Sequence, residues 1–137
     1  MDYRIYLSGG MMKFGKENFI ESDQWRRDIC NKLTGIKCFN PNDHFSFIDD
    51  DIDKWSDREI MNYDIRQLLQ CDLVIYNAND PKSLGSMAEL AIAYTNSIPI
   101  YILNMKKHDL HPWIENMAEH IFDEEEELIR YIENHYC

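Results

Sequence analysis

Glu89 is the side chain in this sequence with the clearest chemical setting. It follows a predicted buried strand (residues 73–76), a polar loop, and the closely spaced Ser83, Gly85 and Ser86, at the start of a predicted helix. Open α/β sheets bind ligands at the carboxyl ends of their strands, where helix N-termini offer free backbone N–H groups. A carboxylate, two hydroxyls and these N–H groups at one strand end predict an active centre. A negative charge is favoured in the first turn of a helix, so Glu89 is expected to be ionised at neutral pH.

The same segment has a purely structural interpretation. Residues 86–89 fit a capping box, in which Ser86 and Glu89 would only start the helix. Ser83 would then be a turn residue. Spacing alone leaves both interpretations open.

Asp64 is the second candidate. It lies in the apolar stripe of a helix predicted from Ser56 or Asp57 to Gln70, four residues from both Ile60 and Leu68. Burying a carboxylate without partners is unfavourable, so this position needs a reason. Either a catalytic role or a structural hydrogen bond to nearby backbone would supply one.

Tyr6, Gly9 and Gly10 stand on and directly after the first predicted strand, residues 4–8. A tyrosine on a central strand is commonly a packing residue, and a glycine pair commonly makes a tight turn. No G-x-G-x-x-G or Walker A pattern accompanies them. Their functional interpretation depends on where the fold places them.

The order of the predicted elements indicates that fold. Strands at residues 4–8, 36–39, 73–76, 98–103 and 120–122 alternate with helices, two of which are expected to start at Ser22 or Asp23 and at Asp123. This alternation predicts a five-stranded parallel sheet covered on both faces, a flavodoxin-like (Rossmann-like) three-layer α/β sandwich in strand order 2-1-3-4-5. Residues 1–137 are expected to form a single domain. The switch point between the first and third strands brings residues 6–10 next to residues 77–89.

Two long segments connect predicted elements. Residues 11–21 have no clear periodicity and are predicted to be a loop over the strand ends. Residues 42–56 are long for a connection in a compact domain, and their aromatic residues favour a loop that carries function over a disordered one.

Composition excludes several classes of function. The formal net charge is −11. Polyanionic partners such as nucleic-acid polymers or anionic membranes are therefore not expected, although a few N–H donors can still hold one phosphate. There is no signal-peptide pattern and no apolar run of membrane-spanning length, which predicts a cytoplasmic protein. The four cysteines include no C-x-x-C pair and are predicted to be free thiols without a disulfide. No metal site is predicted either. The acidic run at residues 49–53 does not match an EF-hand, and the histidines at 108 and 111 have no third ligand nearby in sequence.

Three segments together resemble the nucleoside 2-deoxyribosyltransferase family, and most closely its branch of 2′-deoxynucleoside 5′-monophosphate N-hydrolases. They are IYLSGG, DIRQLLQCDLVI and SLGSMAELAIAY, which occur in the family's order and with compatible spacing. The resemblance implies that Glu89 is the nucleophile, that Asp64 helps activate the leaving base and that Tyr6 lies near the sugar. It also implies that Ser83 and Gly85 hold a 5′-phosphate, with Gly9 in the first substrate loop.

The chain also departs from the family pattern. Gly10, Met11 and Met12 stand where the monophosphate branch has Ser-x-Arg, and Lys13, Lys16 or Lys82 would have to replace that arginine. His111 precedes the late proline, where the transferase branch has an asparagine donated across a subunit interface. His44, Phe45 and Phe47 of the long loop are the candidate nucleobase contacts.

The expected function is cleavage of the N-glycosidic bond of a (deoxy)nucleoside or its 5′-monophosphate through a glycosyl-Glu89 intermediate, without a metal or redox cofactor. Water as acceptor makes a hydrolase and a second base makes a transferase. The alternative is a non-catalytic nucleotide-binding module. A phosphorelay receiver is disfavoured because Ser8-Gly9-Gly10 replaces the acidic residues expected at the first strand end, and a flavodoxin is disfavoured because no Thr/Ser-rich phosphate loop follows that strand. The resemblance also implies a homodimer or a larger homo-oligomer.

Overall fold

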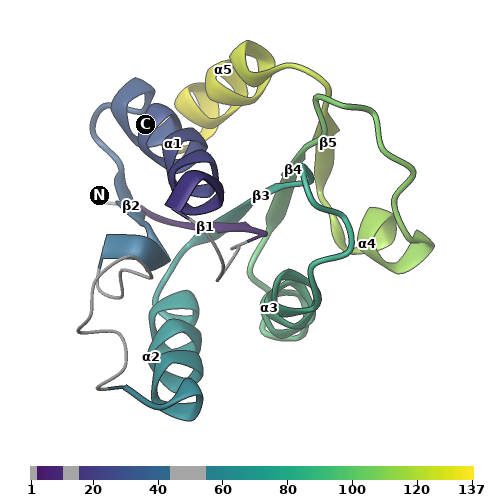
Figure 1. The fold of residues 1–137 in the computed structure, drawn as a ribbon. Helices are drawn as coiled ribbons and strands as arrows, with labels where there is room; N and C mark the ends of the chain where they lie inside the picture. The colour runs from purple at the N-terminus through teal and green to yellow at the C-terminus, as the bar shows by residue number, and fades with distance from the viewer. Residues whose placement is uncertain (1–2, 11–15, 44–54) are drawn as a thin grey trace.

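A computed structural model describes residues 3–10, 16–43 and 55–137, without the side chains of residues 16–19 and 21 (Figure 1). Its centre is a sheet of five strands: β1 (Arg4–Gly9), β2 (Lys37–Phe39), β3 (Leu73–Asn77), β4 (Ile100–Leu103) and β5 (His120–Phe122). The order is β2-β1-β3-β4-β5 and every pairing is parallel. The predicted fold class and strand order are confirmed.

Helices cover both faces of this sheet (Figure 1). One face carries α1 (Lys16–Lys32) and α5 (Glu125–Tyr136), and the other carries α2 (Asp57–Leu69) and α3 (Leu84–Thr95). A short α4 (Pro112–Met117) packs against α3, and a 3₁₀ turn, η1 (Pro41–Asp43), follows β2. None of the described helices is long and apolar enough to cross a membrane.

The alternation of side chains along β1 divides the core in two. Ile5 and Leu7 pack with α1 and α5, whereas Tyr6 belongs to the cluster beneath α2 and α3. Successive side chains of a strand point to opposite faces, so Ser8 lies on the same face as Tyr6. β1 therefore presents two hydroxyls to the α2–α3 side of the sheet, and both residues are fully buried.

Three local expectations were wrong. α1 begins at Lys16, not at Ser22 or Asp23, so the predicted loop over residues 11–21 overlaps a helix. Asp23 lies inside α1, where its carboxylate accepts hydrogen bonds from Asn40 and Asn42 in place of capping a helix. α5 is capped at Glu124, one residue after the predicted Asp123, without a side-chain hydrogen bond.

The predicted start of α2 is confirmed. The Ser56 hydroxyl accepts a hydrogen bond from the Glu59 backbone N–H, and the Glu59 carboxylate accepts one from the Ser56 N–H. This capping box satisfies two of the N–H groups that a helix start leaves without partners. Met61 and Leu69 of the predicted apolar stripe are exposed, and Leu68 carries the stripe into the core.

Candidate active site

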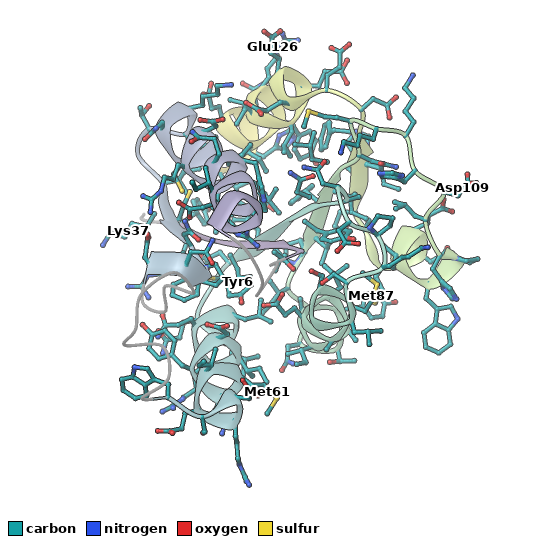
Figure 2. All side chains as sticks on the ribbon, in the orientation of Figure 1. Tyr6, Lys37, Met61, Met87, Asp109 and Glu126 are labelled. Atoms are coloured by element: carbon teal, nitrogen blue, oxygen red, sulfur yellow. The ribbon has the colours of Figure 1, made fainter. Side chains whose placement is uncertain are left out.

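Glu89 meets Tyr6 and Ser8 beneath the end of β1. The Tyr6 hydroxyl donates to Glu89 Oε2, and Ser8 Oγ donates to Glu89 Oε1 at 3.0 Å. Figure 2 shows Tyr6 between the sheet and the helices below it. Residues far apart in the sequence thus converge on one carboxylate, which is a geometry that presents a nucleophile or a general base.

The structure rejects the capping-box interpretation of Glu89. The N-cap of α3 is Ser83, whose hydroxyl accepts from the Ser86 N–H at 3.4 Å and from the Ser86 hydroxyl at 3.1 Å. Glu89 is consequently in the second turn of α3, not in the first as the sequence suggested. Its carboxylate bonds to β1 and not to the helix start.

The structure adds an effect that the sequence argument for an ionised Glu89 left out, namely burial. The pKa of Glu89 is raised above the ordinary glutamate value, chiefly because burial penalises the charged form. Hydrogen bonds from Tyr6 and Ser8, and the positive charge of Arg26, act in the opposite direction. The helix dipole acts mainly within the first turn, so it does not offset the burial of a second-turn residue.

Asp64 faces the same site from α2. Burial, and then the negative charge of Glu89, raise its pKa to about 7, against an opposing effect of Arg26. Its Oδ1 is buried and accepts no hydrogen bond from any residue in the described part of the chain. A carboxyl group with a pKa near neutrality can donate a proton at physiological pH.

Tyr6 keeps its proton throughout the physiological range. Burial, followed by the charges of Glu89 and Asp64, raises its pKa well above the usual tyrosine value. The Tyr6 ring is stacked on Phe39, with 5.3 Å between ring centroids, and the Phe39 ring lies 6.1 Å from that of Tyr63. The phenol is therefore a fixed hydrogen-bond donor to Glu89, held by aromatic packing.

The predicted glycine and serine contacts divide into two groups. A Cβ at Gly9 would lie 2.9 Å from the Trp25 ring, and a Cβ at Gly10 would lie 2.8 Å from Cβ of Asp80. Close packing thus explains both glycines, and their contact with substrate remains a prediction. At Gly85 a Cβ would meet none of the described atoms within 4 Å, so there is room for a ligand beside the N-terminus of α3.

Several site residues were missed from sequence, and three predicted ones fall outside the structural description. The missed ones are Ser8, Arg26 and Phe39. Strand alternation from Tyr6 would have identified Ser8, whereas no local pattern indicates Arg26. The predicted nucleobase contacts His44, Phe45 and Phe47 lie outside the described residues.

Metal ligands do not gather in the described part of the chain. No group of three or more histidine, cysteine, aspartate or glutamate side chains there could hold a metal ion. All four cysteines are free thiols. The chemistry that these residues offer is that of carboxylates and hydroxyls.

No family model matches this sequence, and no curated protein matches it. Solved structures do match. A conserved protein from Enterococcus faecalis V583 has a TM-score of 0.81 at 18% identity, over 98% of this chain and 99% of that chain. A 2-deoxyribosyltransferase from Bacillus psychrosaccharolyticus has a TM-score of 0.71 at 15% identity, over 93% of this chain and 91% of that one.

This chain has the fold of a 2-deoxyribosyltransferase. A CMP N-glycosidase from Clostridium botulinum shares it too, with a TM-score of 0.60 at 18% identity, over 96% of this chain and 98% of that chain. At these identities the likeness is one of fold. Chemistry must therefore be argued from the side chains of this chain.

Proposed function

We propose that this protein cleaves the N-glycosidic bond of a (deoxy)nucleoside or its 5′-monophosphate. The observation that carries the proposal is the Glu89 carboxylate, held by hydroxyl donors from β1 and facing an aspartate of near-neutral pKa on α2. Retaining glycosidic cleavage needs such a pair, namely one ionised carboxylate as nucleophile and one protonated acid for the leaving group. Structural neighbours that transfer deoxyribose or cleave CMP support the same reaction class.

In the first step, a Glu89 oxygen bonds to the anomeric carbon of the sugar while the bond from that carbon to the base nitrogen breaks. The departing base takes the bonding electron pair, and Asp64 donates the proton that neutralises it. In the second step, water or a second base attacks the anomeric carbon and breaks its bond to the Glu89 oxygen, which releases the Glu89 carboxylate, while the attacking group gives its proton to the Asp64 carboxylate and so restores the acid. Water yields hydrolysis, and a base yields transfer. Carboxylate and hydroxyl groups suffice for both steps, so we propose no metal or redox cofactor.

The Tyr6 and Ser8 hydroxyls position the Glu89 carboxylate for this attack. Both donate to it in the resting protein, so the nucleophile is oriented before substrate arrives. The charge of the carboxylate also stabilises the oxocarbenium-like transition state. The Ser83 hydroxyl and the Gly85 N–H, at the start of α3, would hold the 5′-phosphate.

A panel of nucleosides and 5′-monophosphates tests this proposal, with released base measured in the presence and absence of a second base. Base release in water alone identifies a hydrolase, and base exchange identifies a transferase. Binding without either product would contradict the proposed reaction and identify a nucleotide-binding module.

Ser83→Ala is expected to weaken the use of monophosphates and to spare nucleosides. The loss of a hydrogen bond to a charged phosphate corresponds to about 1.5–3 kcal/mol, or roughly 10- to 100-fold in kcat/KM. Ser83 is also an N-cap, so the variant should lose about 1 kcal/mol of unfolding free energy. Ser56→Ala is the matched control, because it removes the N-cap of α2 but should leave the preference for monophosphates unchanged. Equal losses for nucleosides and monophosphates in Ser83→Ala would remove the phosphate assignment.

We also propose that the protein forms a homodimer or a larger homo-oligomer through α3 and α4. Leu84 is 83% exposed, Trp113 77% and Tyr94 56%, which is unusual for residues so apolar. Two cavities of about 310 and 340 Å³ lie along this surface and share Ala91, Trp113 and Met117. A charged residue in an apolar interface is strongly unfavourable. Light scattering of Trp113→Glu should therefore show monomers where the unsubstituted protein is oligomeric, and a monomeric unsubstituted protein would contradict the proposal.

A further inference from the structure

Arg26 is a fully buried cation at the end of β1. Its Nε donates to the Leu7 carbonyl at 3.3 Å, its Nη2 donates to the Gly9 carbonyl at 3.1 Å, and its Nη1 donates to the Ser22 carbonyl at 2.5 Å. The guanidinium also lies 4.7 Å from the centroid of the Trp25 ring. A buried charge held mainly by backbone carbonyls is expensive and calls for an explanation.

The short length of β2 accounts for the position of this side chain. β2 pairs with β1 only as far as Tyr6, opposite Phe39, although β1 continues to Gly9. Carbonyls of the odd-numbered residues of β1 point toward β2, as the bond from the Lys37 N–H to the Tyr3 carbonyl shows. Arg26 therefore occupies the place of a longer β2 and satisfies the Leu7 and Gly9 carbonyls. A neutral donor would meet the same hydrogen-bonding need, so packing alone does not explain the charge.

The electrostatic surroundings of Arg26 indicate what the charge does. Burial lowers the pKa of Arg26 to about 10, and the acidic group that most opposes this effect is Glu89. In turn, Arg26 lowers the pKa of both Glu89 and Asp64. The guanidinium thus places a positive charge at the end of β1, the strand from which Tyr6 and Ser8 donate to Glu89.

We propose that Arg26 is a positioning residue of the reaction, which supplies the counter-charge that keeps Glu89 ionised while Asp64 stays protonated, and which clamps the strand end that carries Ser8. This inference rests on the proposed function and deepens it. The positive charge of Arg26 balances one carboxylate, so the net charge of the site is closest to zero when only one of Glu89 and Asp64 is ionised. Hydroxyl groups donate to both oxygens of Glu89, which favours its charged form. Asp64 Oδ1 has no such donor among the described residues, so Asp64 is the acid that keeps its proton.

Other groups that face Glu89 do not supply this counter-charge. From β1 come the neutral hydroxyls of Tyr6 and Ser8, and from α2 comes Asp64, a second acid. Tyr76 of β3 lies on the same face of the sheet, and burial raises its pKa to about 12, so it is neutral below that pH. α4 packs on the far side of α3, where its His111 cap and Glu115 are exposed. Among these described neighbours, Arg26 is the group that carries the positive charge.

Two substitutions separate charge from clamping. Arg26→Gln removes the charge but retains amide donors for the carbonyls, and Arg26→Lys retains the charge but loses the planar fork. The direct readout is the ionisation of Glu89, followed by ¹³C NMR of labelled glutamate carboxyls and assigned with Glu89→Gln. We expect the Glu89 midpoint to rise by about one to two pH units in Arg26→Gln and to stay near its original value in Arg26→Lys. The acid limb of the kcat/KM profile should move with it.

Arg27→Gln is the matched control, since the same substitution one residue along α1 removes an exposed guanidinium that pairs with Asp23 and Asp43. It should leave the Glu89 midpoint unchanged. An equal shift in Arg26→Gln and Arg26→Lys, or no shift in either, would overturn the proposal. If Arg26→Gln does not fold, the unsubstituted protein still decides, because a Glu89 that stays protonated up to pH 7 contradicts the assigned charge. Titration as expected without base release from any substrate would refute the proposed function, whereas the effect of Arg26 on the ionisation of Glu89 would stand.

Discussion

Glu89→Gln is expected to lower the rate of base release by several orders of magnitude, which corresponds to about 4 kcal/mol or more of lost transition-state stabilisation. Glutamine keeps the size and shape of the side chain and can still meet the Tyr6 and Ser8 hydroxyls. It cannot form the glycosyl ester, and it lacks the charge that stabilises an oxocarbenium ion. Single-turnover assays of base release measure the loss, with near-normal turnover as the contradicting result.

Two further measurements on Glu89→Gln separate the loss of the nucleophile from misfolding. Burial disfavours a charged carboxylate, so Glu89→Gln should unfold at the same or a higher temperature than the unsubstituted protein. Because the charge of Glu89 contributes to the raised pKa of Asp64, that pKa should fall below about 7 in the variant. A nearly inactive protein with intact stability and a lower Asp64 pKa would exclude misfolding as the cause.

Mass spectrometry of the unsubstituted enzyme, quenched in acid during turnover, should find the sugar on the peptide that contains Glu89.

Asp64→Asn is expected to reduce turnover by about 10²- to 10⁴-fold, with a much smaller effect on substrate affinity. An amide cannot transfer a proton to the departing base. In the unsubstituted protein, kcat/KM should fall as the pH rises above about 7, where Asp64 loses its proton. Asp64→Asn should lack this alkaline limb. A loss confined to affinity would remove the proton-donor role.

The raised pKa of Asp64 also predicts how stability varies with pH. In the unfolded chain an aspartate loses its proton near pH 4, whereas folded Asp64 keeps it to about pH 7. Between these values the unfolded state binds fewer protons, so the free energy of unfolding decreases as the pH rises. The stabilisation is fully present below about pH 4 and is lost through pH 7. Asp64→Asn should flatten this slope in urea unfolding curves, leaving the part that the raised pKa of Glu89 contributes in the same direction.

Local patterns were sufficient for the fold and for part of the site. Apolar runs separated by helical periodicities indicated the parallel sheet and its order, because short-range patterns decide which segments become strands and helices. The acid inside the α2 stripe, Asp64, stood out for the same reason. The start of α1 was missed because residues 16–21 lack a clear apolar period. The spacing of Ser86 and Glu89 suggested that these two residues cap α3, whereas the N-cap is Ser83.

By itself, the sequence determined that Tyr6 and Glu89 belong to elements meeting at one end of a parallel sheet, since β and α periods are properties of neighbouring residues. Asp64 was assigned to the same site only through the family resemblance. Only the tertiary structure decided that Ser8 and Tyr6 bind the Glu89 carboxylate and that Arg26 completes the edge of β1. It also decided that the pKa values of both acids are raised, because a pKa depends on burial and on charges brought close by folding. The contacts of Ser8 and Tyr6 with Glu89 join residues 81 and 83 positions apart, a separation that no local pattern encodes.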